Sequence, residues 1–81
     1  MKHLPLSNLK KIYNKHDYSA YIHTPSETVV VYRGIDKGGY TLGAHVGEKH
    51  KSQDWREVML FGCPHHIRME IISAWKMESQ S

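Results

Sequence analysis

The sequence predicts a small α+β domain with the element order α-β-β-β-α, or α-β-β-β-α-α if its C-terminal part forms two helices. Apolar residues recur at helical spacing near both ends of the chain, whereas the middle alternates or carries β-branched runs. Glycine and proline lie between these segments, as expected for turns. A sheet this small has to bury one face, and the helices are its only cover. We therefore expect a three-stranded antiparallel meander with the helices packed on one face.

The first predicted helix spans residues 7–16. Ser7 is a plausible N-cap because its hydroxyl can accept a hydrogen bond from a first-turn amide. Leu9, Ile12 and Tyr13 have the i, i+3, i+4 spacing that produces one narrow apolar helix face.

The predicted sheet follows this helix. Residues 18–23 and 40–46 alternate between two sets of side chains, which is typical of strands. Residues 28–33 contain the β-branched run Val29–Val31, which favours a central strand. The connections are predicted to be a turn at residues 24–27, which contains Pro25, and a hairpin turn at residues 36–39, which contains Gly38 and Gly39.

The C-terminal part is predicted to be helical after a basic loop at residues 47–51. One helix is expected to begin at the cap Ser52 and to end at Gly62, and a second is expected to begin at Pro64. A single helix over residues 52–77, bent at Gly62, is the alternative. The apolar face of the second helix is predicted to be Ile67, Ile71 and Trp75.

Length and composition place limits on the class of protein. The chain has 81 residues, which predicts one domain with an ordered core over about residues 6–77 and a frayed tail at 78–81. Cys63 is its single cysteine, so no internal disulfide can form, and this fits a reducing compartment. We find neither a signal peptide nor the run of about 20 apolar residues that spans a membrane. These observations predict a cytoplasmic protein without a membrane partner.

The charge balance permits a nucleic-acid partner but does not require one. The formal net charge is +3 with neutral histidines, which is the sign that nucleic-acid binding needs and excludes an acidic DNA mimic. Lysines gather before residue 16 and again near residue 50. The candidate phosphate contacts are Lys10, Lys11, Lys15, Lys49 and Lys51.

Chemistry-bearing residues form no complete catalytic or metal-binding motif. Cys63, His65 and His66 are suitable zinc ligands, but a second ligand pair at the usual spacing is missing. Cys63 near a helix N-terminus could be nucleophilic, although adjacency in sequence does not provide a base. His23 and His45 could act as an acid–base pair on RNA. We assign no catalytic residue, no metal and no cofactor.

The strongest candidate surface is the sheet face that the helices leave uncovered. Tyrosine and arginine are enriched in protein interfaces, and aromatic side chains also stack on bases. Which side chains of strand 28–33 point outward stays open at this point. The candidate partner-binding residues are Tyr21, His23, Tyr32, Arg33 and His45.

The favoured function is a small non-catalytic binding module that docks onto a larger protein partner as an inhibitor or adaptor. Small chains without catalytic motifs are common among phage- and plasmid-encoded effectors. The first alternative is a basic nucleic-acid-binding regulator that contacts phosphates through its lysines. The second is a metal-independent ribonuclease-like toxin. A chain of 81 residues has a small core, which a homodimer would enlarge. A homodimer fits either of the two binding functions.

Overall fold

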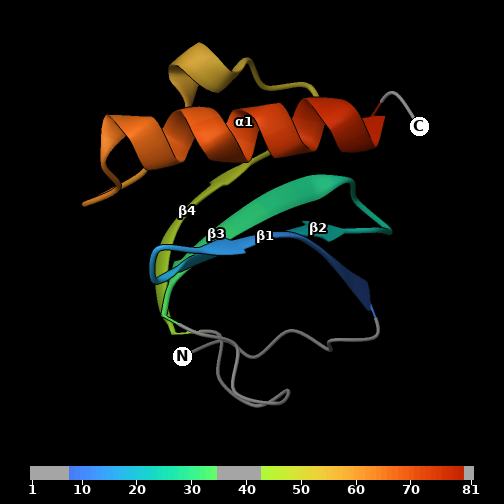
Figure 1. The fold of residues 1–81 in the computed structure, drawn as a ribbon. Helices are drawn as coiled ribbons and strands as arrows, with labels where there is room; N and C mark the ends of the chain where they lie inside the picture. The colour runs from blue at the N-terminus through green and yellow to red at the C-terminus, as the bar shows by residue number, and fades with distance from the viewer. Residues whose placement is uncertain (1–7, 35–42, 80–81) are drawn as a thin grey trace.

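The computed structural model describes residues 8–34 and 43–79, which form a four-stranded antiparallel sheet covered on one face by a helix (Figure 1). The strands follow the order β1-β2-β3-β4, so each pairs with its neighbour in sequence. The small α+β class is confirmed, but the predicted three-stranded meander and its element order are not, because the sheet has four strands and its first strand lies where a helix is predicted. The elements are β1 Leu9–Lys15, β2 Tyr18–His23, β3 Thr28–Arg33, β4 Ala44–Lys49, the 3-10 helix η2 Trp55–Glu57 and α1 His65–Ser79.

The predicted helix over residues 7–16 is wrong, because β1 occupies this segment. The pairing of β1 with β2 shifts register between Lys11 and Tyr13, which leaves Ile12 as the extra residue of a β-bulge. Ile12 and Tyr13 consequently both pack against the main core, although they are neighbours in sequence. The bulge breaks the period of two and produces apolar spacing that resembles a helix.

A two-residue turn, His16–Asp17, joins β1 to β2. Both residues have positive φ angles, 54° and 66°, as a type I′ hairpin turn requires. Histidine and aspartate tolerate this region better than most residues, but glycine or asparagine is the usual signal. The sequence therefore offered no clear turn at this position.

The strands predicted at residues 18–23 and 28–33 are confirmed as β2 and β3. The next strand lies further along the chain than we predicted, because β4 includes residues 47–49, which we had placed in a loop. The predicted hairpin turn at residues 36–39 and the start of the strand predicted at 40–46 lie outside the described residues. Gly47 accounts for part of this error, since glycine in a strand weakens the strand signal.

The predicted helix from Ser52 to Gly62 is wrong, as is the single bent helix over residues 52–77. Only η2 is helical there, and its cap is Asp54, whose carboxylate accepts the N–H of Arg56 at 2.9 Å. Val58 already has extended backbone angles.

Arg68 of α1 binds the backbone of this segment from the neighbouring helix. Its guanidinium donates to the Val58 carbonyl at 3.0 Å and also to the Trp55 carbonyl. The Arg68 side chain thus satisfies the Val58 carbonyl and adds a second donor to the Trp55 carbonyl, which already accepts the Val58 N–H at 3.1 Å.

The helix predicted after Pro64 is confirmed as α1. Its Ile67 and Ile71 are fully buried against the sheet. Glu78, which we had placed in the frayed tail, lies in the last turn and forms an ion pair with Lys10. No helix within residues 8–34 and 43–79 is long and apolar enough to cross a membrane. The buried residues of the main core are Tyr13, Tyr18, Ala20, Val29, Val31, Val46, Trp55, Val58, Ile67 and Ile71.

Candidate docking groove

The five residues predicted for the sheet face do not share one surface. Four of them lie on the face away from α1, because Tyr21 pairs with Val30, His23 with Thr28, and His45 with Tyr32. Arg33 lies on the opposite side, over the Tyr18 ring, with 5.9 Å between its guanidinium carbon and the ring centroid.

The two tyrosines of this face are buried, which was not expected for a docking surface. Tyr21 and Tyr32 are only 2% and 5% exposed and form a second small cluster with Val30, against which Leu9 packs. Their rings meet edge to face at 6.1 Å. Burial, helped by the charge of Glu48, raises the pKa of Tyr32. These rings therefore act as core in this structure, and His45 and Arg33 are the two well-exposed members of the predicted set.

The positions of His23 and His45 argue against their acting together on one phosphate. His23 pairs with Thr28, whereas His45 pairs with Tyr32, four residues further along β3. At the usual rise per strand residue this separates the Cα atoms of the two histidines by at least about 13 Å. An acid and a base must each come within hydrogen-bond reach of the reacting group. His23 is also engaged locally, with 2.7 Å between its Nδ1 and the Ser26 hydroxyl.

The five candidate phosphate-binding lysines lie on opposite edges of the sheet. Lys10, Lys11 and Lys15 belong to β1, whereas Lys49 and Lys51 belong to or follow β4. Two of them pair with acids of the same chain. Lys51 lies 2.8 Å from the Glu27 carboxylate, and Lys10 pairs with Glu78. This arrangement gives the lysines no common track for a phosphate backbone.

Lys49 has a structural role that the sequence did not indicate. It is only 4% exposed, and its ammonium lies 4.6 Å from the Trp75 ring centroid and 5.8 Å from that of Trp55. The two indole rings meet edge to face at 5.8 Å. A cation held between two indoles contributes to packing through cation–π attraction and is shielded from an external phosphate.

The segment around Cys63 has no feature of a reactive or metal-binding centre. Burial raises the pKa of the Cys63 thiol, which favours the less nucleophilic neutral form, although Arg68 opposes the shift. His65 and His66 are exposed. Within the described ranges, no three His, Cys, Asp or Glu side chains come together as metal ligands.

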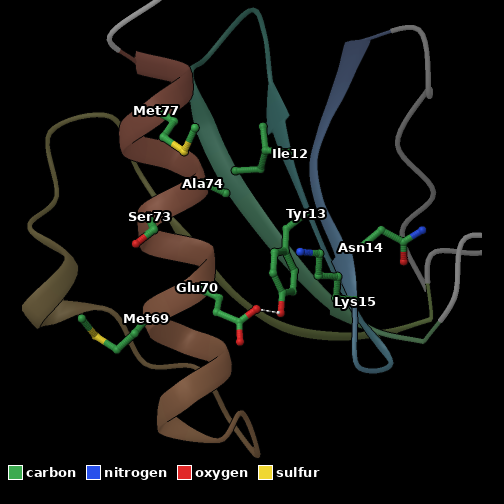
Figure 2. Close-up of a pocket in the computed structure, with 9 residues that line it drawn as sticks. All are labelled: Ile12, Tyr13, Asn14, Lys15, Met69, Glu70, Ser73, Ala74 and Met77. Carbon is green, nitrogen blue, oxygen red and sulfur yellow. Dashed lines mark hydrogen bonds between the residues drawn. The ribbon is translucent and has the colours of Figure 1, made fainter.

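An open groove of about 440 Å³ runs between β1 and α1 (Figure 2). In the figure the side chains of Ile12, Ala74 and Met77 lie at one end, and Met69 lies toward the other. Met69 and Met77 are 47% and 73% exposed, although both are large and apolar. The lining residues are Ile12, Tyr13, Asn14, Lys15, Met69, Glu70, Ser73, Ala74 and Met77.

Tyr13 and Glu70 join the two walls of this groove. The Tyr13 hydroxyl donates to the Glu70 carboxylate at 2.9 Å, as the dashed line in Figure 2 marks. Burial raises the pKa of Tyr13 to about 12, and the neighbouring Glu70 carboxylate adds to the shift. The contact fixes β1 against α1 and occupies one of the few acids near the groove.

The two edges of the sheet differ in how they are covered. The segment after η2 runs along β4: the Phe61 N–H donates to the Val46 carbonyl at 3.1 Å, and the Met59 carbonyl and the Leu60 side chain lie over Gly47. In the part of the chain that the structure describes, β1 pairs with β2 alone. Its outer edge therefore lies beside the groove without a partner strand.

Sequence reasoning missed this groove because it assigned β1 to a helix. One signal was present: Met69, Ser73 and Met77 recur every four residues and so form a stripe along one side of α1. Comparison with known proteins finds no matching family model, no matching curated protein and no matching solved structure. The function is therefore inferred from the geometry of the chain itself.

Proposed function

We propose that this chain is a non-catalytic binding module that docks onto a larger protein partner, as an inhibitor or adaptor would, through the groove between β1 and α1. The observation that carries the proposal is the groove itself, an apolar trough beside a strand edge that no other strand of residues 8–34 and 43–79 covers. Exposed apolar side chains that gather in one place are typical of interaction sites. Methionine suits such a site because its flexible thioether adapts to different partner surfaces.

The arrangement of the other candidates favours this proposal over the two alternatives. The lysines lie on two edges, and two of them pair with acids of the same chain. The two histidines of the ribonuclease hypothesis are too far apart to act on one phosphate.

Site-specific photocrosslinking tests the proposal. A crosslinking amino acid in place of Met77 should capture a discrete protein from the native lysate, and nuclease treatment should leave the product unchanged. The matched control is the same amino acid in place of Lys76, an exposed neighbour outside the groove. With the captured protein purified, Ser73→Trp should block the complex, because Ser73 is exposed and lines the groove, which a bulky neutral side chain would fill.

Two results would contradict the proposal. Equal capture from both positions would mean that the groove is not the contact surface. Products that nuclease destroys would favour the nucleic-acid alternative.

A further inference from the structure

We infer that the occupant of the groove is an extended, acidic peptide segment of the partner, which adds to the sheet as a strand along the outer edge of β1. This inference rests on the proposed function and specifies the chemistry of the partner. It is carried by three observations: the uncovered strand edge, the apolar wall beside it and the charge of β1.

The uncovered edge supplies backbone hydrogen bonds. In an antiparallel sheet, every second residue of an edge strand turns its N–H and C=O away from the neighbouring strand. β1 has seven residues and pairs with β2 alone in the described part of the chain. An extended peptide could satisfy these groups in the manner of β-strand addition, whereas a helical peptide would leave them unpaired.

The apolar wall supplies pockets for alternate side chains of such a peptide. Side chains of an added strand point alternately to the two faces of the sheet. Those on the α1 side would enter the groove and meet Ile12, Met69 and Met77. Because these wall residues are flexible or partly exposed, they would adapt to different apolar side chains.

The charge of β1 determines which peptide fits. β1 carries three lysines and no acid. Lys15 lines the groove and has no ion pair within the described residues, whereas the nearby acid Glu70 is engaged by Tyr13. Lys11 pairs in register with Tyr21 and so belongs to the opposite face. Glutamate or aspartate on either face of the added strand would therefore oppose a lysine, which is a favourable cross-strand pair.

The same charge disfavours a second copy of this chain as occupant. Antiparallel pairing of β1 with its own copy would bring two strands of like charge together, and like charges opposite each other destabilise a sheet. Edge lysines are a known means of preventing this self-pairing. An acidic strand meets no such barrier.

Selection from a random peptide library displayed on phage tests the inference. The library is selected on the full chain and depleted on the Ser73→Trp variant, whose bulky side chain fills the groove without a change of charge, so that the survivors depend on the groove. We expect the survivors to alternate apolar residues with aspartate or glutamate. A selected peptide should lose its binding when alternate backbone amides are N-methylated in a synthetic copy, because N-methylation removes the N–H donors that strand addition needs. Lys15→Glu should weaken its binding about tenfold, whereas the matched Lys76→Glu should not.

The outcomes separate this inference from the proposed function. Survivors that depend on the groove but are helical, neutral or basic, or that tolerate N-methylation, would overturn the strand addition and leave the docking function standing. A library without any survivor that distinguishes the wild-type chain from Ser73→Trp would overturn both.

Discussion

Tyr13 connects the core of the molecule to its proposed docking site. Its ring is buried between the sheet and α1, while its hydroxyl donates to Glu70 at the groove wall. The neutral phenol suits both roles, because ionisation would place a second negative charge against the Glu70 carboxylate. Burial and this carboxylate together raise its pKa from 10.0 to about 12.

This shift predicts a specific loss of stability at high pH. The phenol has its ordinary pKa in the unfolded chain, so its contribution to stability is complete below about pH 10. The contribution falls as the pH rises from 10 toward 12, because the unfolded chain then releases the proton more readily than the folded chain. Urea unfolding of the wild type and of Tyr13→Phe should give a free-energy difference that is constant from pH 7 to 9.5 and then decreases. A difference that stays constant up to pH 11.5 would show that Tyr13 is not held protonated.

Individual residues account for much of what the sequence left undecided. The i, i+3, i+4 spacing of Leu9, Ile12 and Tyr13 looked helical because one bulge residue shifts the alternation of a strand. Lys49 contacts Trp55 from the loop segment that follows β4 and Trp75 from α1, so no regular local spacing indicated that this lysine would be buried between two indoles. Such errors arise wherever a tertiary contact overrides a local preference.

At the scale of elements, the strongest local patterns were reliable. The alternation of residues 18–23 indicated β2, and the valine run indicated β3. The helical spacing that follows Pro64 indicated α1. The helix predicted around η2 was wrong because the conformation of this segment depends on Arg68 of α1, which donates to the carbonyls of Trp55 and Val58. The groove could not be predicted for the same reason, since it exists only once β1 and α1 lie side by side.

The covering of the β4 edge predicts a large cost for a small substitution. A Cβ atom at Gly47 would lie 2.3 Å from the Met59 carbonyl oxygen and 2.8 Å from Leu60 Cδ2. Gly47→Ala should therefore force the covering segment away and destabilise the fold by about 1–3 kcal/mol in thermal or urea unfolding.

Gly62→Ala is the matched control for this effect. Gly62 has a φ of +73°, but a Cβ atom there would meet nothing within 4 Å. Its substitution should cost only the backbone strain of about 1 kcal/mol. Amide exchange should separate the two variants: Gly47→Ala should expose the Phe61 amide, which donates to Val46, whereas Gly62→Ala should leave it protected. Equal exchange of this amide in both variants would contradict the proposed steric contact.

At the scale of the whole molecule, the two edges of the sheet differ in what protects them from unwanted strand pairing. The chain covers β4 with its own backbone, whereas β1 is marked by positive charge. A covered edge is closed to every partner, but a charged edge excludes only partners of the same sign. Among the described strands, selective addition is therefore possible at the β1 edge alone, and the proposed docking depends on this difference.

This asymmetry predicts how the chain behaves alone in solution. At low salt, repulsion between β1 lysines should keep copies apart at this edge, and sedimentation velocity should report a monomer. The double variant Lys11→Thr/Lys15→Thr should self-associate, because threonine favours strands and removes the repulsion. The wild type should associate more as salt is added, because screening weakens the interaction between exposed charges. Lys76→Thr removes one charge on α1 and should stay monomeric at low salt. A wild-type dimer at low salt with protected β1 amides would mean that this edge already has an occupant of its own kind.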